Sequence, residues 1–244
     1  MKHVISTVLV VLGFVATSLP SAAQFTTEKA IDSTQTSAED QKMQLMVTDF
    51  RTKKMIEADV MVKGLNPRKT TVFKDMSDST LILKKYRIYT VSVVKKGYMY
   101  FAHKFWPEET NTHFERIELK PLAVGLKTNV EDITFLGDET QIYHKSVPAL
   151  EELMEFLKLN PTVSICVIGH ANGPATVEQK SESYYKKASE KRSQAVVDYL
   201  IQHGIPEARL TVRGMGNKQM VYPDPQTDWQ VEANRRIEIE ITNL

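Results

Sequence analysis

The stretch ICVIGHANG, residues 165–173, passes from an apolar run into a polar loop bounded by glycines. A short apolar run beside turn residues is typical of a strand buried on both faces of a sheet. Helical spacing follows from about residue 183 to 203 and stops at Gly204, with Pro206 just beyond. The stretch therefore predicts a buried strand, a glycine loop and a long helix, in that order.

Three further strands and one more helix are predicted around this unit. Ser146 and Pro148 mark the cap and first turn of the other helix, whose apolar positions form one stripe. The stripe positions are Leu150, Leu153, Met154 and Leu157. The further strands are expected at residues 129–135, 209–214 and 235–242, and the strand of the first unit spans residues 162–170. This β-α-β-α-β-β order predicts an α+β domain over residues 122–244, with helices packed on a mixed sheet.

Residues 43–121 have a different pattern. Short runs alternate apolar and polar residues, and turn signals such as NPRK (66–69) and PEETN (107–111) separate them. Alternation between closely spaced turns predicts an antiparallel β-sandwich. The chain is thus expected to contain two domains, which a length of 244 residues allows.

The N-terminus has the three parts of a secretory signal peptide. Lys2 gives a basic start, residues 4–16 are apolar, and small residues surround Ala23, after which cleavage is expected. The apolar run is shorter than the roughly 20 residues that a membrane-spanning helix needs. Residues 1–23 are therefore predicted to be a signal peptide, and the polar residues 24–42 a flexible leader.

Charge and motif content argue against several classes of protein. Cleavage would remove one of the 31 Lys and Arg residues, which leaves them equal in number to the 30 Asp and Glu residues, so no nucleic-acid partner is expected. None of the six histidines has Glu three residues on, as a zinc peptidase would require. The chain has no Gly-x-Ser-x-Gly elbow, and Cys166 lies inside a predicted strand. We therefore expect a protein that is not an enzyme and holds no metal or cofactor.

Two arginines are predicted to point toward the apolar side of the second domain. Arg192 lies four residues after Ala188 and four before Val196, so its stem shares their helical face. Arg235 has the parity of Ile237 in the last strand. A buried guanidinium needs a partner, and its planar fork suits a carboxylate. The spacing leaves two alternatives open, a ligand carboxylate or an acid of the same chain. The candidate acids of the chain are Asp132 and Asp138.

Five landmarks occur in order along the second half of the chain. They are Phe135 with Asp138, residues 169–172 (GHAN), residues 188–193 (ASEKRS), residues 214–216 (GMG) with Pro223, and residues 234–238 (NRRIE). In this order they resemble the C-terminal domain of the OmpA family, whose members are periplasmic modules that bind peptidoglycan. The resemblance covers about residues 122–244 and implies the same fold and a cell-wall ligand.

The resemblance also implies a ligand site. In the family, an arginine of the helix motif binds the carboxylate of diaminopimelate in the stem peptide, and an aspartate of the loop binds its amine. These roles fall to Arg192 and to Asn172, which stands where the family has the aspartate. Arg235 and Asp138 complete the implied ligand site. The implied supporting residues are Gly169, His170, Gly173 and Asn234.

Two residues of the loop carry separate expectations. A neutral amide bonds an ammonium less strongly than a carboxylate does, so Asn172 predicts weaker or altered ligand binding. His170 has no catalytic partner at a fixed spacing, and its ring is expected to hydrogen-bond the backbone of the loop.

Residues 80–100, TLILKKYRIYTVSVVKKGYMY, contain a Lys-Gly-Tyr turn at 96–98. With the preceding strands they resemble the transthyretin-like or carboxypeptidase-regulatory sandwich. Modules of that kind mediate contacts, so residues 43–121 are expected to bind an outer-membrane or other envelope protein.

The sequence therefore predicts an exported periplasmic protein of a gram-negative envelope, associated with the cell wall or outer membrane, that binds peptidoglycan. The alternative is a structural or protein-interaction module that has lost peptidoglycan affinity because Asn172 replaces the acid.

Overall fold

The computed structural model describes residues 40–65, 68–85, 87–105, 113–136, 140–173 and 180–244. The predicted signal peptide and residues 24–39 of the predicted leader lie outside the described residues. The first strand begins at Asp40, so the last three residues of the predicted leader belong to a strand. None of the helices in the described parts of the chain is long and apolar enough to cross a membrane.

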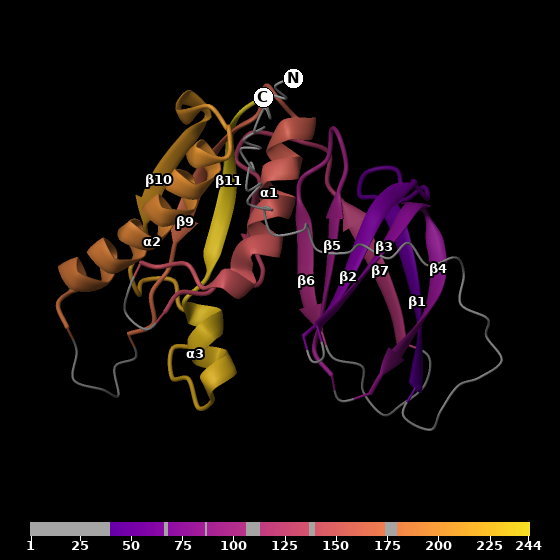
Figure 1. Ribbon diagram of the computed structural model, residues 1–244, viewed down its shortest axis with the longest axis horizontal. Coiled ribbons are helices and arrows are strands. Elements are labelled where there is room, and N and C mark those ends of the chain that lie inside the picture. Colours follow the sequence, from indigo (N-terminus) through magenta and orange to yellow (C-terminus); the bar gives the residue numbers. More distant parts are fainter. Residues whose placement is uncertain (1–39, 66–67, 86, 106–112, 137–139, 174–179) are drawn as a thin grey trace, which may run out of the picture.

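Seven strands in the N-terminal half form two sheets (Figure 1). They are β1 (Asp40–Asp49), β2 (Ala58–Leu65), β3 (Arg68–Met76), β4 (Asp78–Lys84), β5 (Tyr89–Val94), β6 (Phe101–Phe105) and β7 (His113–Leu119). One sheet has the order β4-β1-β7 and the other β3-β2-β5-β6. The pairs are antiparallel except β1 with β7, which run parallel. The prediction of purely antiparallel strands is wrong for this pair, which joins the first and last strands of the unit.

The two sheets bury a common apolar core. It includes Met43, Leu45 and Val47 of β1, Val60 and Val62 of β2, Val91 and Val93 of β5, and Ile117 and Leu119 of β7. These positions alternate along each strand, as the side chains of one face must. The alternation seen in the sequence thus marks the faces that the two sheets turn toward each other.

The C-terminal half is a mixed four-stranded sheet with three α-helices (Figure 1). Its elements are β8 (Lys127–Val130), η1 (His144–Ser146), α1 (Val147–Leu159), β9 (Ser164–Gly169), α2 (Glu182–Gln202), η2 (Glu207–Arg209), β10 (Leu210–Gly214), α3 (Asp228–Asn234) and β11 (Ile237–Asn243). The strand order is β10-β9-β11-β8, with β9 parallel to β10 and β11 antiparallel to both its neighbours. The α+β class and the mixed sheet are confirmed. The predicted order lacked α3, a helix of seven residues.

The apolar face of this sheet carries the helices. Ile237, Ile239 and Ile241 of β11 are buried in one cluster with the predicted stripe of α1. Within that stripe Leu150, Leu153 and Leu157 are fully buried, whereas Met154 is partly buried. The predicted helix face is therefore confirmed.

Two predicted boundaries before α1 are wrong. The strand expected at 129–135 ends at Val130, because Asp132 takes a left-handed backbone conformation with φ 64°. Ser146 precedes the helix but does not cap it with its side chain. Its Oγ instead accepts a hydrogen bond from the backbone N–H of Thr134 at 2.9 Å, which ties the helix start to the segment after β8.

Helix α1 lies between the two halves of the molecule (Figure 1). The outer face of the β3-β2-β5-β6 sheet contacts α1 through a row of polar side chains. The row consists of Lys63, Thr90 and Lys104, which are neighbours across β2, β5 and β6. Lys63 Nζ lies 2.8 Å from Glu152 Oε1 of α1, and both side chains are at least 90% buried. We call this row and its carboxylates the lysine row.

Asp132 binds the two residues at the other end of the lysine row, Thr90 and Lys104. Lys104 Nζ lies 2.9 Å from its Oδ1, and Thr90 Oγ1 donates a hydrogen bond to its Oδ2 at 2.7 Å. Burial by itself would raise the pKa of Asp132, but Lys104, Thr90 and Lys63 outweigh it and lower that pKa. Tyr100 donates to Glu152 Oε2 at 3.2 Å, and burial together with this carboxylate raises the pKa of its phenol.

The segment between β7 and β8 is bonded to both halves. Met99 N donates to Lys120 O at 2.8 Å and Leu122 N to Gly97 O at 3.0 Å. On the other side Gly125 N donates to Ile241 O at 2.8 Å. The backbone of the connection is thus hydrogen-bonded to both of the folded parts that it joins.

We predict that Lys63→Met destabilises the protein by about 3 to 5 kcal/mol, because it leaves Glu152 buried without its cation. Adding Glu152→Gln should restore more than half of this loss, since the amide removes the buried charge and can still accept from Tyr100. Chemical denaturation measures both changes. As a matched control, Lys218→Met removes an ion pair with Glu182 in which both side chains are at least 60% exposed, and it should cost less than about 1 kcal/mol. Equal effects of Lys63→Met and Lys218→Met would contradict the prediction.

Candidate functional site

The loop of residues 169–173 is held by the backbone of two other segments. His170 N donates to Arg236 O at 3.0 Å, and Ala171 N donates to Gly216 O at 2.8 Å. Met215 N donates to Gly169 O at 2.9 Å. The loop is therefore fixed between the end of β10 and the start of β11.

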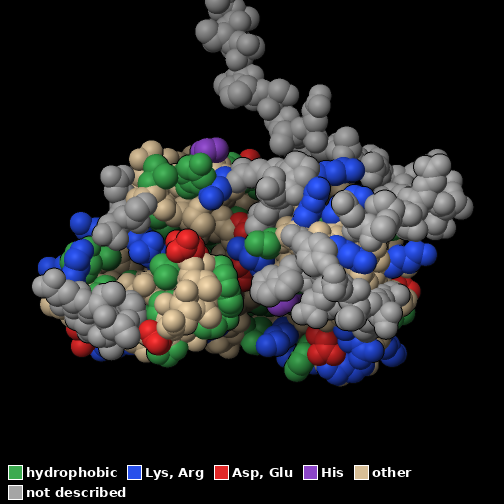
Figure 2. Space-filling model, turned by 90° about the horizontal axis from the view of Figure 1, so that it is seen from below, with side chains coloured by type: hydrophobic (Ala, Val, Ile, Leu, Met, Phe, Trp, Pro, Cys, Tyr) green, Lys and Arg blue, Asp and Glu red, His purple; other side chains and the backbone are tan. Residues whose placement is uncertain are grey.

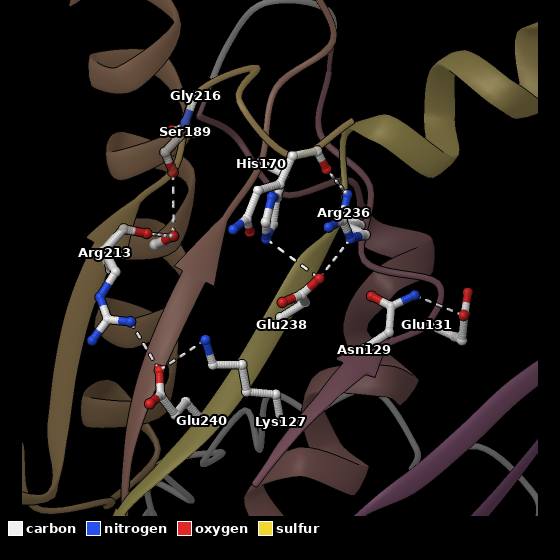
Figure 3. Close-up of polar contacts among 12 residues, drawn as sticks. Lys127, Asn129, Glu131, His170, Ser189, Arg213, Gly216, Arg236, Glu238 and Glu240 are labelled. Atoms are coloured by element: carbon white, nitrogen blue, oxygen red, sulfur yellow. Dashed lines mark hydrogen bonds and ion pairs between the residues drawn. The ribbon is translucent and has the colours of Figure 1, made fainter. Parts of the chain in front are cut away.

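Two glycines let α2 lie directly on the ends of the strands. A Cβ at Gly169 would be 2.2 Å from the backbone oxygen of Ser189, and one at Gly214 would be 2.6 Å from that of Lys186. Ser189 Oγ also accepts a hydrogen bond from Gly216 N at 2.9 Å (Figure 3). Sequence reasoning missed Ser189, although the small residues Ser189 and Ser193 recur one turn apart on the same helix.

Asn234 connects the loop to the segment after β10. It is fully buried, and its side chain pairs with both backbone groups of Tyr222. Its Nδ2 also donates to Asn172 Oδ1 at 2.7 Å. The structure thus brings together Asn172 and Asn234, two of the residues predicted for the site.

Arg192 points inward, as its helical spacing predicts. It is 5% exposed, and its guanidinium lies over the ring of Phe135, with Cζ 5.5 Å from the ring centroid. The negative face of an aromatic ring attracts a cation, so this contact holds the head group in place. Two landmarks far apart in the sequence, Phe135 and Arg192, therefore meet in space.

Arg235 lies differently from the prediction. Strand β11 begins at Ile237, and Arg235 is the C-terminal cap of α3, so the parity of the strand does not reach it. Its side chain is 32% exposed, and its Nη1 lies 3.5 Å from Glu232 Oε1. It stands directly after the buried Asn234, at the edge of the site.

Of the two acids considered as partners of the arginines, the structure describes only Asp132. Asp132 belongs to the lysine row, where it pairs with Lys104. Asp138 lies outside the described residues, and its place in the ligand site stays a prediction.

His170 faces the acid Glu238, which lies on the face of the sheet that α1 and α2 do not cover (Figure 3). Its ring is 1% exposed, with Nε2 3.4 Å from Glu238 Oε1, and Arg236 Nε donates to the same oxygen at 2.7 Å. The expectation that the ring hydrogen-bonds the loop backbone is wrong, because neither ring nitrogen has a backbone hydrogen-bond partner and Nε2 faces Glu238 instead. The His170 ring and Arg236 overcome the effect of burial and lower the pKa of Glu238 to about 2.

The α3 end of the molecule carries exposed apolar side chains (Figure 2). Val221 and Trp229 are each about half exposed, at 53% and 51%. The ring of Tyr222 meets Trp229 edge-on, with 5.0 Å between the centroids. This surface adjoins the Asn234 pair, since Tyr222 is its backbone partner.

A separate hollow of about 450 Å³ lies between α2 and the end of β10. Its walls include Glu182, Lys186, Glu190, Arg213 and Lys218. None of the residues predicted for the ligand site lines it, so it adds nothing to that site.

The chemistry available in the site is hydrogen bonding and charge. It contains the buried guanidinium of Arg192, the partly exposed guanidinium of Arg235 and the amide of Asn172. Within the described ranges, no group of three His, Cys, Asp or Glu side chains is placed to hold a metal ion. The arrangement suits a ligand with an anionic or acceptor group.

Comparison with known proteins finds a family match for the part of the chain that contains this site. Residues 134–235 match the model of the OmpA family, so this part of the chain is an OmpA-like domain. The chain is 29% identical over 111 residues to outer membrane porin F of Pseudomonas aeruginosa, a match that covers 45% of this chain and 30% of that protein. It is 31% identical over 123 residues to outer membrane protein A of Citrobacter freundii, covering 46% of this chain and 50% of that protein. The chain thus spans half or less of the length of these two relatives.

Solved structures with a similar arrangement include two bacterial proteins. The periplasmic domain of Helicobacter pylori MotB is 21% identical, with a TM-score of 0.41, over 48% of this chain and 81% of that one. The peptidoglycan-associated lipoprotein from Burkholderia pseudomallei is 19% identical, with a TM-score of 0.38, over 46% of this chain and 88% of that one. The likeness of residues 43–121 to a transthyretin-like sandwich stays a prediction.

We predict that Glu238→Gln lowers the stability of the fold at neutral pH but not in strong acid. The pKa of Glu238 falls from its ordinary 4.5 to about 2 in the folded chain, so its contribution is complete above about pH 5 and is lost as the pH falls toward 2. At pH 7 the variant should be less stable by on the order of 2 kcal/mol, after discounting for solvent screening. Urea denaturation between pH 2 and 7 measures the difference. A gap between wild type and variant that is as wide at pH 2.5 as at pH 7 would contradict this.

We predict that Gly169→Ala destabilises the chain more than Gly204→Ala. The first adds a Cβ against backbone atoms of α2, which forces helix and strand apart at a cost of roughly 3 kcal/mol. The second meets no atom within 4 Å, and its φ of 92° costs only about 1 to 2 kcal/mol. Thermal unfolding of both variants decides the order, and a reversed order would show that α2 yields to the added methyl group.

Proposed function

We propose that the chain is a non-catalytic protein of a gram-negative cell envelope whose OmpA-like domain binds the diaminopimelate residue of a peptidoglycan stem peptide. The observation that carries the proposal is the buried Arg192, held against Phe135 in a domain that matches the OmpA family model. The names of the relatives, outer membrane porin F and outer membrane protein A, support an envelope location.

Each site residue has a proposed role. Arg192 binds a carboxylate of diaminopimelate through its planar fork, which can form two parallel hydrogen bonds. Arg235, partly exposed at the edge, adds a second cation for the peptide, and Asp138 lies where the family has a polar pocket residue. Asn172 meets the other end of the ligand. Gly169, His170, Gly173 and Asn234 shape and hold the loop.

The remaining parts of the chain have supporting roles in this proposal. Residues 1–23 direct export to the periplasm, and residues 24–42 precede the folded part. Residues 43–121 are proposed to be a transthyretin-like sandwich that contacts an outer-membrane or other envelope protein. The domain of residues 122–244 associates the protein with the cell wall, without metal, cofactor or nucleic acid.

One observation favours a second function. Asn172 is neutral where the family has an acid, so the chain is alternatively a structural or protein-interaction module that has lost its affinity for peptidoglycan. Under this alternative the OmpA-like fold is kept for its contacts alone.

Sedimentation with purified peptidoglycan sacculi tests the proposal. The wild-type chain should sediment, and Arg192→Met should reduce its affinity at least tenfold, because the substitution removes a charge-assisted bidentate contact. Arg213→Met is the matched control, since this arginine pairs with Glu240 on the open face of the sheet and should leave binding unchanged. Thermal unfolding confirms that each variant is folded.

The proposal fails if the wild-type chain stays in the supernatant, or if Arg192→Met sediments as well as Arg213→Met. The first result favours the interaction module, and the second moves the binding site away from Arg192.

A further inference from the structure

The orientation of the Asn234 amide is fixed by the backbone of Tyr222. Tyr222 N donates to Asn234 Oδ1 at 2.9 Å, and Asn234 Nδ2 donates to Tyr222 O at 2.7 Å. A backbone N–H can only donate and a backbone carbonyl can only accept, so exchanging the oxygen and nitrogen of Asn234 would break both bonds.

This orientation fixes the amide of Asn172 in turn. The remaining hydrogen of Asn234 Nδ2 is directed at Asn172, 2.7 Å away, and only an oxygen can receive it. Asn172 Oδ1 is therefore turned toward the fully buried Asn234, and its Nδ2 occupies the opposite side of the planar amide group. Since Asn172 is half-buried, the group it offers on that side is a hydrogen-bond donor.

An aspartate at this position would present the opposite polarity. One of its oxygens could accept the hydrogen bond from Asn234, and the other would offer a negative charge to an ammonium. The buried Asn234 is thus compatible with either residue at position 172. With asparagine, a ligand ammonium would meet an N–H donor instead of an acceptor.

We propose that Asn172 makes this site select stem peptides in which the side-chain amine of diaminopimelate is acylated, in preference to peptides with a free ammonium. This inference rests on the proposed function. Acylation turns the amine into a neutral amide and adds a carbonyl oxygen, which can accept a hydrogen bond from Asn172 Nδ2. In peptidoglycan, acylation occurs where the amine is joined to the carbonyl of a neighbouring stem peptide. The site therefore recognises cross-linked wall, with Arg192 still on the carboxylate of the same residue.

Two synthetic tripeptides that end in meso-diaminopimelate test the inference, one with a free side-chain amine and one with that amine acetylated. Titration calorimetry on the full chain at pH 7 should show that the wild type binds the acetylated peptide more tightly. Asn172→Asp should reverse the order and favour the free amine by about tenfold, because an ammonium bonds a carboxylate far better than a neutral amide does.

Each outcome has a distinct meaning. Equal affinity of the wild type for the two peptides, or a preference for the free amine, overturns the inference and leaves the proposed function in place. Failure of the wild type to bind either peptide overturns the proposed function and the inference with it. The comparison of the two peptides on the wild type needs no substitution, so it decides the matter even if Asn172→Asp does not fold. Arg192→Met should weaken the binding of both peptides to the same extent, which separates the contact on the carboxylate from the contact on the amine.

Discussion

The ion pair between Lys63 and Glu152 is the interaction on which the joining of the two halves depends. A charge buried without a partner costs several kcal/mol, so neither residue tolerates separation from the other. Thr90 and Lys104 extend the same row to Asp132, on the turn after β8. Strand β5 shows the consequence, since five of its six residues are buried. Its Val91 and Val93 lie in the core between the two sheets, and its Thr90 lies in the lysine row on the opposite face. Helix α1 is thereby shared between the sheet of its own domain and the sheet of the other.

The candidate site depends on neutral groups instead. Two glycines bring α2 against the strand ends, and Asn234 ties the loop to Tyr222 by hydrogen bonds that do not change with pH. The charges in the site then belong to the arginines, whose guanidinium groups remain protonated in proteins. The arginines of the site therefore keep their charge over the pH range in which Glu238 is titrated.

Local periodicity was enough to predict β9, α2, the buried stripe of α1 and the inward direction of Arg192. It could not predict pairing between distant segments, such as the parallel β1 and β7, or the burial of Lys63 and Thr90 under α1. It missed α3 because seven residues without an apolar stripe give no periodic signal. It placed Arg235 on the wrong element for the same reason. The ring of His170 was misjudged because Glu238 comes beside it only when β11 pairs with β9.

The connection between β7 and β8 has a mechanical consequence. Its backbone is bonded to residues 97–99 on one side and to Ile241 on the other, and α1 fills the space between the sheets. A linker bonded in this way gives no slack, so it holds the two halves at a constant spacing. The loop of residues 169–173 is thereby kept at a set distance and angle from the β4-β1-β7 sheet at the far side of the molecule (Figure 1).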